Sequence, residues 1–249
     1  MEFIRQYYFD FHVMGDNLSP ILDGFWLTLK LSILGGIFSL LWGLVLAVLR
    51  QLPGRGLAPV RWLTIGYIDV FRGIPLLIVL LLVSGGLSTL AAPVGGDVLP
   101  DFIGKPTWFG ETSPFWYGVI SLTITYGAYM AEVYRAGIES VSGGQMEAAR
   151  SLGMSHSQAM RHVIVPQAVR RVIPPLLNDF IALMKDTSLV SILGAAEVVY
   201  VGRQIQSDTF NGSGLVMGAI LFLIVTIPLA RLVDYMIGRQ QARYERGMA

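Results

Sequence analysis

Among the ionisable residues that fall within long apolar stretches of this 249-residue chain, three could do chemistry there. Asp179 and Asp186 are seven residues apart, a spacing that places both within about 20° of one face of a helix. Arg72 lies in a Gly-Ile-Pro stretch, where a helix is expected to break or kink. Charged side chains inside a membrane are costly unless they are paired or hydrated, so each is a candidate functional residue. The guanidinium could bind an α-carboxylate, and the two carboxylates could bind an amino group or a cationic side chain.

Two interpretations of these charges remain open from the residues alone. In the first, they line a path for a charged solute, to which Thr187 and Ser188 would add neutral hydrogen bonds. In the second, they form internal salt bridges, Arg72 with Asp179 or Lys185 with Asp186, that hold the membrane-spanning helices together. The first interpretation is favoured here.

The composition requires these residues to lie in a membrane protein. Hydrophobic residues make up 53% of the chain and charged residues 14%, against about 25% charged residues in a soluble domain. With a net charge of +1 and no cysteine, the chain is not a disordered segment, a disulfide scaffold or a nucleic-acid binder. We expect an all-α fold with five transmembrane helices, at about residues 25–49, 62–82, 115–134, 172–193 and 215–237.

The distribution of basic residues predicts the orientation of these spans. Eleven Lys and Arg lie in the segments 50–61, 135–171 and 239–249, whereas the opposite segments carry three. Loops rich in Lys and Arg stay in the cytoplasm, so the N terminus is predicted outside and the C terminus inside. Two pairs at span ends, Glu132 with Arg135 and Arg231 with Asp234, are expected to be structural, and Asp69 is expected to pair with a neighbouring Arg.

The remaining segments are assigned as follows. Residues 1–24 form an external amphipathic segment, residues 25–239 the transmembrane domain, and residues 240–249 a cytoplasmic tail. The outer segment 87–114 is rich in Pro and Gly and is interpreted as an irregular connector.

The longest cytoplasmic segment, 139–167, is predicted to form two short helices rather than a plain connector. Ser142 with Gln145 and Ser155 with Gln158 both have the spacing of a capping box at a helix start. Gly153 can end the first helix in a left-handed turn, and Pro166 is expected to limit the second. The result would be a small, rigid, partly apolar knob, which either docks on a partner or packs on the chain's own helix ends.

Three motifs of this chain resemble those of ABC-importer permease subunits, in the branch that carries polar amino acids. Glu147-Ala148-Ala149, then Gly153 and a stretch ending at Pro166, is similar to that family's EAA loop. The stretch 72–77 is similar to the branch's Arg-Gly-Thr-Pro-Leu-Leu motif, and the stretch 185–189 is similar to its Lys-Asp-Thr-Ser-Leu motif. The resemblance covers about residues 24–239 and implies a type I importer permease in a bacterial inner membrane.

What the resemblance implies is a transport role in an assembly. The EAA loop would couple to a cytoplasmic ATPase dimer, and Glu147 and Gly153 would be most closely tied to that role. A second permease chain and an external amino-acid-binding protein would complete the complex within the lipid bilayer. The chain has no phosphate-cradling loop, so ATP and Mg would be bound by the separate ATPase subunit.

Other function classes are weaker. No Ser/His/Asp or metal-ligand constellation occurs, so neither catalytic residues nor a metal site is expected. The main alternative is an ion-coupled secondary transporter that uses the buried carboxylates as a relay, but five spans do not divide into the two related halves usual in such folds. A membrane scaffold would not need the buried charges.

Overall fold

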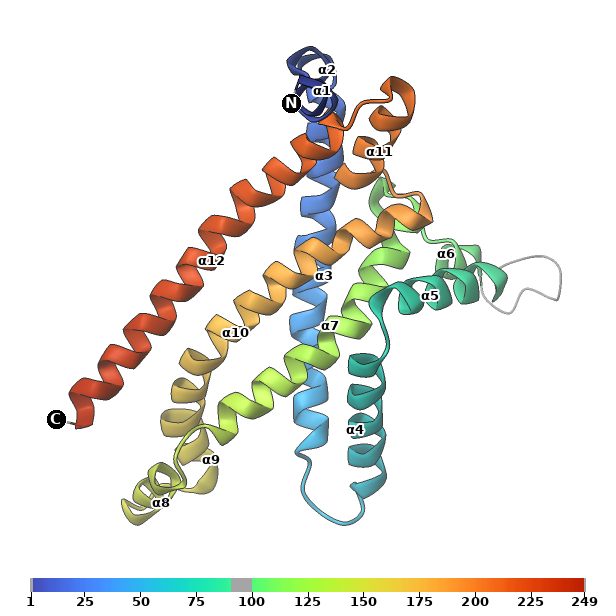
Figure 1. Ribbon diagram of the computed structural model, residues 1–249. Coiled ribbons are helices and arrows are strands. Elements are labelled where there is room, and N and C mark those ends of the chain that lie inside the picture. Colours follow the sequence, from blue (N-terminus) through green and yellow to red (C-terminus); the bar gives the residue numbers. More distant parts are fainter. Residues whose placement is uncertain (1, 91–99, 249) are drawn as a thin grey trace.

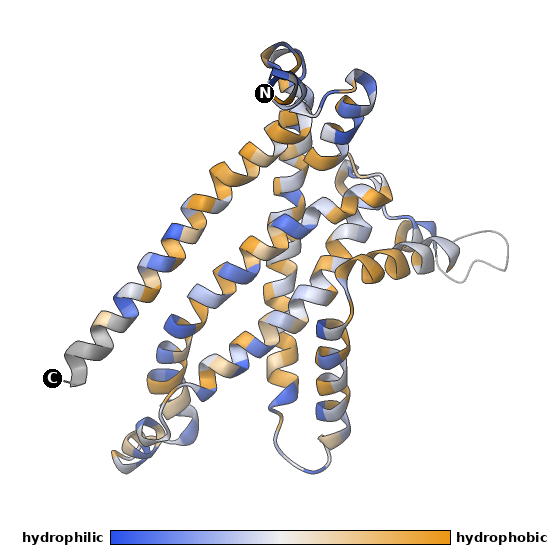
Figure 2. Ribbon diagram, in the orientation of Figure 1, coloured by the Kyte–Doolittle hydropathy of each residue, from blue (hydrophilic) through white to orange (hydrophobic). Residues whose placement is uncertain are grey.

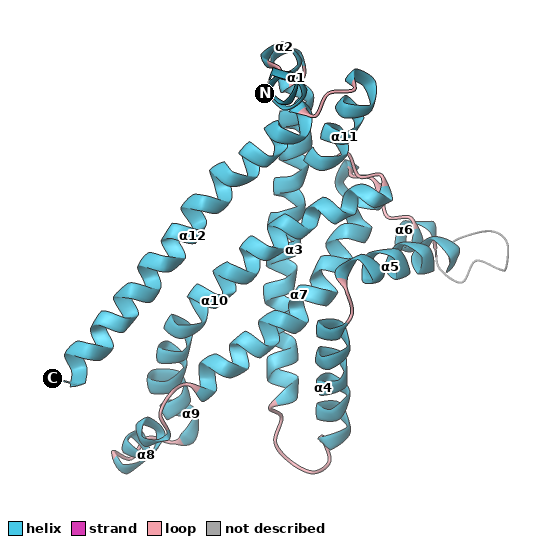
Figure 3. Cartoon of the chain, viewed as in Figure 1, coloured by secondary structure: helices cyan, strands magenta, loops and turns pink. Residues whose placement is uncertain are grey.

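The computed structural model describes residues 2–90 and 100–248, and within these ranges the chain forms helices and no strand (Figure 3). Two short helices open the chain, α1 (Glu2–Tyr8) and α2 (Phe11–Asp16), followed by the long α3 (Leu18–Arg50). The later elements, in chain order, are α4 (Ala58–Gly73), α5 (Leu76–Leu90), α6 (Asp101–Gly104), η1 (Trp108–Gly110), α7 (Ser113–Glu139), α8 (Gly143–Ser151), α9 (His156–Ala159), η2 (Met160–Ile164), α10 (Val165–Asp186), η3 (Thr187–Leu193), α11 (Val198–Thr209) and α12 (Ser213–Met248).

Two of the described helices are long and apolar enough to cross a membrane by themselves, α3 and residues 213–240 of α12. The pair α4 and α5 would meet the same criterion together, but the two helices are bent by 111° at their junction. The predicted span at 62–82 is therefore not one straight helix. Figure 1 shows α5 running almost at right angles to α4.

The other predicted spans also fall on helices. The segment 115–134 lies within α7, 172–193 covers most of α10 and all of η3, and 215–237 lies within α12. The predicted external segment 1–24 is not separate from the first long helix, because α3 already begins at Leu18. Of the predicted connector at 87–114, residues 91–99 lie outside the described residues.

Helix α11, between η3 and α12, was not predicted. Its buried residues Val198, Gly202 and Ile205 recur at helical spacing. Its first residue follows Glu197, whose buried side chain accepts a hydrogen bond from the backbone N of Tyr200 at 2.8 Å. Burial raises the pKa of this carboxyl to about 7, because no cation balances its charge among the groups that act on it. The apolar spacing after an acidic residue is the signal that could have identified this helix.

Helices α3 and α7 pack closely along much of their length, and this pair forms the centre of the fold (Figure 1). Glycines make the close approach possible, because a Cβ atom at Gly43 would lie 2.9 Å from the carbonyl oxygen of Gly127. Leu31 and Leu122 are fully buried at the α3–α7 contact, together with Val190 of η3. Helices α4, α5 and α10 also pack against α7, which is therefore the central helix of the fold.

Hydrophobic residues dominate α5 and the N-terminal half of α12, whereas hydrophilic residues gather on α8 and α9 (Figure 2). Ion pairs lie near the helix ends. Glu132 and Arg135 pair at 2.7 Å, and Arg231 and Asp234 pair at 3.5 Å, so both predicted structural pairs are confirmed. Among the described residues Asp69 has no ion pair, so its predicted pairing is wrong.

Candidate functional site

A cavity of about 440 Å³ lies where three elements meet: the junction of α4 with α5, the middle of α7 and the C-terminal half of α10. The junction supplies five consecutive lining residues, and α7 and α10 supply three each. The lining consists of Arg72, Gly73, Ile74, Pro75, Leu76, Thr125, Tyr126, Tyr129, Asp179, Ala182 and Asp186. The three ionisable residues singled out in the sequence therefore line one cavity.

The junction between α4 and α5 follows from its sequence. Ile74 precedes a proline and has extended backbone angles (φ −93°, ψ 131°), as residues before proline usually do. Pro75 then starts a new helix, since its carbonyl accepts from the backbone N of Ile78 at 2.9 Å. The C-terminal end of one helix and the N-terminal end of the next thus both lie at the cavity. Broken helices of this kind bring backbone groups to solute sites in membrane proteins.

Helix α7 contributes two tyrosines that organise the charged groups. The hydroxyl of Tyr126 donates to the Asp186 carboxylate at 2.8 Å. The ring of Tyr129 lies 5.6 Å from the guanidinium carbon of Arg72, a cation–π distance, and its hydroxyl donates to the Arg72 carbonyl at 3.2 Å. The tyrosines therefore position Asp186 and Arg72 without neutralising either charge.

Two polar atoms of the cavity lining have no hydrogen-bond partner among the described residues. These are Oδ2 of Asp179 and Oγ1 of Thr125, both buried. Buried polar atoms are nearly always hydrogen-bonded, so two unsatisfied ones at the same cavity indicate capacity for a bound molecule. Within the described residues Arg72 makes no ion pair with Asp179, and Lys185 makes none with Asp186. The salt-bridge interpretation therefore has no ion pair to support it.

Thr187 and Ser188 do not line this cavity. Thr187 is fully buried and donates to the carbonyl of Met184, in the last turn of α10, at 2.7 Å. Ser188 lines a separate cavity of about 250 Å³ between α10, α11 and α12, together with Lys185. The consecutive positions 185–188 thus face different sides, because each helical residue is rotated about 100° from the previous one.

Thr125, Tyr126 and Tyr129 were not predicted as site residues. Their hydroxyls carry no formal charge, so they do not stand out in an apolar stretch as Asp or Arg does. Their spacing of one and four residues places all three on one side of α7. A search for hydroxyl residues grouped on one face of a predicted span would have found them.

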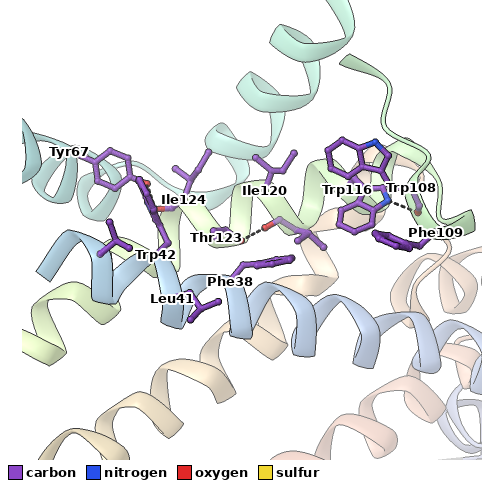
Figure 4. Close-up of a pocket in the computed structure, with 12 residues that line it drawn as sticks. Phe38, Leu41, Trp42, Tyr67, Trp108, Phe109, Trp116, Ile120, Thr123 and Ile124 are labelled. Carbon is purple, nitrogen blue, oxygen red and sulfur yellow. Dashed lines mark hydrogen bonds between the residues drawn. The ribbon is translucent and has the colours of Figure 1, made fainter. Parts of the chain in front are cut away.

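A larger cavity, of about 580 Å³, lies along α3 and α7 and has a different character (Figure 4). Its lining is aromatic and aliphatic and includes Phe38, Trp42 and Trp116, with no ionisable group except the Tyr67 phenol. That phenol is already engaged, since it donates to the Ile124 carbonyl and accepts from the Trp42 indole. This cavity offers nothing to bind a charged solute.

The segment 139–167 forms the predicted pair of short helices, α8 and α9. Gly153 has φ 85°, in the left-handed region, so it ends α8 as predicted. The backbone N of Met154 donates to the Ala149 carbonyl at 3.2 Å, and that of Gly153 donates to the Arg150 carbonyl at 3.0 Å. These two bonds define a Schellman motif, which turns the chain sharply at a fixed angle.

The two predicted capping boxes have different outcomes. Ser155 and Gln158 form theirs, with bonds of 3.2 and 2.8 Å in the two directions. Ser142 caps α8 by position only, because its side chain makes no capping bond. Pro166 does not limit the second helix: α9 runs through the π-helical turn η2 into α10, and Pro166 lies in the first turn of α10. Pro166 has no N–H to donate, and the turn directly before it is π-helical, with the backbone N of Val165 donating to the Met160 carbonyl, so the α-helical pattern that a proline would break is already interrupted there.

The EAA residues divide between the inside and the outside of this knob. Ala149 is buried, whereas Glu147, Ala148, Gly153 and Pro166 are exposed. Leu152, at the end of α8, is 82% exposed. Buried Val141 and Ile164 and half-buried Met146 give the knob a small core of its own. The segment is therefore a compact element that presents an acidic and an apolar side chain outward.

The chain matches known transport proteins along most of its length. Residues 39–242 match the family described as binding-protein-dependent transport system inner membrane component. A probable glutamine ABC transporter permease protein, GlnM of Bacillus subtilis, is 36% identical over 238 residues, covering 93% of this chain and 98% of the relative. The glutamate/aspartate import permease protein GltK of Escherichia coli O157:H7 is 32% identical, covering 92% of this chain and 97% of the relative.

Solved structures agree with this assignment. The crystal structure of an amino acid ABC transporter with histidines has a chain that is 34% identical, with a TM-score of 0.78 over 92% of this chain and 98% of that one. The methionine transporter MetNI has the same fold at 21% identity and a TM-score of 0.66, covering 89% of this chain and 98% of its own. The chain is thus a multi-pass bacterial membrane protein that belongs to the family of binding-protein-dependent transport system inner membrane components.

Proposed function

We propose that this chain is the permease subunit of an ATP-driven importer of polar amino acids. The named relatives support this, since GlnM is described as a probable glutamine permease and GltK as an import permease for glutamate and aspartate. Each is similar to this chain over most of its length. The ion-coupled alternative finds no support among these relatives.

In this proposal the cavity between the α4–α5 junction, α7 and α10 binds the amino acid. Arg72 would bind the α-carboxylate, and Asp179 and Asp186 would bind the α-amino group or a cationic side chain. The observation that carries the assignment is the pair of unsatisfied buried atoms, Asp179 Oδ2 and Thr125 Oγ1, at this cavity. Lys185 lines the separate cavity near α12, so the balance here is two carboxylates to one guanidinium. That balance favours a basic or a neutral zwitterionic amino acid.

Energy would enter through the segment 139–167. The exposed Glu147 and Leu152, held by the turn at Gly153, would dock in a groove of a cytoplasmic ATPase dimer that binds ATP and Mg. Because η2 joins this segment to α10 without an interruption, movement of the ATPase dimer would be transmitted to Asp179 and Asp186. Neither catalytic residues nor a metal site is assigned to this chain.

The proposed topology has five passes, with the N terminus outside and the C terminus in the cytoplasm. The second pass would be the bent pair α4 and α5. A second permease chain would complete the pathway, and an external binding protein would deliver the amino acid.

Uptake by proteoliposomes that contain the permease with its ATPase subunit and binding protein tests the proposal. We expect accumulation of labelled arginine or glutamine that requires ATP and survives collapse of the ion gradients. Asp186→Asn should raise KM about tenfold, because a charge-assisted hydrogen bond becomes a neutral one. Asp234→Asn, an exposed acid near the inner end of α12, is the matched control. Gradient-driven uptake without ATP would refute the importer assignment, and wild-type KM in Asp186→Asn would remove that carboxylate from the site.

A further inference from the structure

A small cavity of about 210 Å³ lies between the first turns of α10 and the C-terminal part of α12. It is distinct from the proposed amino-acid site, and none of the three motifs noted in the sequence contributes to it. Its lining combines basic, amide, aromatic and aliphatic side chains, which are Arg170, Ile173, Tyr235, Met236, Arg239 and Gln240. Figure 1 shows that this part of α10 and the C-terminal part of α12 lie at the same end of the molecule as α8.

The two arginines give this cavity a positive charge that no described acidic side chain balances. No acidic residue lines it, and among the side chains that the structure describes neither guanidinium pairs with a carboxylate. The Arg239 guanidinium lies over the ring of Tyr235, with its central carbon 5.6 Å from the ring centre. Two other arginines that are predicted to lie on this side, Arg50 and Arg135, both bond to Glu132. Two guanidiniums without an anion at one cavity indicate an anionic ligand.

The cavity is a built feature rather than a gap between mobile side chains. The side-chain amide of Gln240 donates to the carbonyl of Arg170 at 2.5 Å, which joins the two helices beside the cavity. Both arginines are placed on regular helix, so their separation is set by the packing of α10 against α12. An anion that bridges the two guanidiniums would therefore strengthen an existing contact.

The position of this cavity relative to the membrane indicates which kind of anion it binds. In the proposed topology the fourth span begins near residue 172 and the fifth ends near residue 237, so the cavity lies at the cytoplasmic boundary of the bilayer. Tyr235 is 61% exposed, and a tyrosine is favoured at the level of lipid headgroups. Ile173 and Met236 continue the lining with apolar surface, as an acyl chain would require. Basic pockets between helices at this depth suit phospholipid headgroups.

We propose that this cavity binds the phosphate of an anionic phospholipid from the inner leaflet, with Arg170 and Arg239 as its ligands. The proposal rests on the orientation given under Proposed function. It does not depend on which amino acid is carried.

Lipid binding to the purified, delipidated permease–ATPase complex tests this proposal. Native mass spectrometry would count bound lipid during titration with dioctanoyl phosphatidylglycerol, with dioctanoyl phosphatidylcholine, and with inorganic phosphate in competition. The variants are Arg170→Gln and Arg239→Gln. The matched control is Arg55→Gln. Arg55 is exposed, lies in the segment 50–61 that is predicted to be on the same side of the membrane, and has no described partner for its side chain.

We expect phosphatidylglycerol to bind in preference to phosphatidylcholine, and each pocket variant to weaken it about fivefold, the effect of about 1 kcal/mol per basic residue. The control should bind as wild type does. Equal binding in all variants, or displacement of the lipid by millimolar phosphate, would overturn the proposal. Loss of the ATPase subunit from the pocket variants with lipid binding unchanged would also overturn it, and would assign the arginines to that subunit. Uptake is not measured, so failure here leaves the importer assignment standing.

Discussion

Substitution of Gly118 by alanine should disturb the packing that holds the end of α10 in place. A Cβ atom at this position of α7 would lie 2.7 and 2.9 Å from the two methyl groups of Val190, in η3, and 3.3 Å from Leu31. Val190 is fully buried and β-branched, so it has no alternative rotamer into which to retreat. Overpacking of this kind costs about 1–3 kcal/mol.

The size of the effect can be separated from other causes by a double-mutant cycle. Val190→Ala alone removes two methyl groups and should cost about 2 kcal/mol. When Val190→Ala is combined with Gly118→Ala, the Val190 methyl groups that would clash are absent. The methyl group of the new alanine at position 118 then occupies part of the space that they leave. The double variant should therefore be about as stable as Val190→Ala, with a coupling energy of about 1–3 kcal/mol between the two sites.

Thermal unfolding of the detergent-solubilised chain, followed by tryptophan fluorescence, measures these differences. For a chain of this size 1 kcal/mol corresponds to about 2–4 °C in Tm, so Gly118→Ala should melt several degrees lower. Gly66→Ala is the matched control, because Gly66 lies in α4 with no atom within 4 Å of its added Cβ. Additive effects of the two substitutions, within about 0.5 kcal/mol, would refute the packing argument.

Three further predictions concern the coupling segment, a buried carboxyl and the cavity. Gly153→Ala should destabilise the turn by about 1–2 kcal/mol and lower ATP-dependent uptake, because a φ of 85° disfavours any side chain even where space is open. Gly144→Ala is the control: Gly144 does not have a positive φ, so neither the stability of the turn nor uptake should fall. In the folded chain the pKa of Glu197 is raised to about 7. The protonated carboxyl therefore stabilises the fold fully at a pH below the pKa of the unfolded chain, and this stabilisation is lost as the pH rises through about 7. Glu197→Gln should abolish that part of the pH dependence of Tm, and an unchanged pH profile would contradict it. Tyr126→Phe should raise KM about tenfold without changing ATPase assembly, because Asp186 loses its positioning hydrogen bond; an unchanged KM would exclude that role.

The sequence was most informative where a local rule was sufficient. The αL turn at Gly153 and the capping box at Ser155 depend on a few neighbouring residues, and both are present. Pro75 predicted a break, but not its 111° bend, because the direction of α5 depends on packing against α7 and η3. The reciprocal half of the Ser142 capping box does not form for a related reason: the side-chain oxygen of Gln145, expected to accept from the Ser142 backbone N, accepts instead from the Gln167 amide at 3.4 Å. A long-range contact of this kind has no local signature.

The cavity lined by Arg72, Asp179 and Asp186 likewise has residues that could be predicted from the sequence and residues that could not. Arg72, Asp179 and Asp186 were predictable because charge in an apolar stretch requires an explanation, and the seven-residue spacing placed the two acids on one face. Their tyrosine neighbours carry no such signal one by one, since a phenol is tolerated in a membrane span for structural reasons alone; only their grouping with Thr125 on one face of the span could have identified them. Thr187 and Ser188 were misplaced because adjacency in sequence was taken for adjacency in space, although helical rotation separates consecutive residues.

Whether a charged side chain has an ion-pair partner separates structural from functional charges in this chain better than its depth in the membrane does. Near the end of α7 that leads into α8, Glu132 is bonded by both Arg50 and Arg135, and near the other end Lys30 is bonded by Glu111. These charges are satisfied within the chain, so they stabilise the helix bundle and leave nothing for a ligand. Among the described residues, the Arg72, Asp179 and Asp186 charges at one cavity and the Arg170 and Arg239 charges at another have no ion-pair partner. Since unpaired charge is retained only where something compensates it, these two cavities are where bound molecules should be sought.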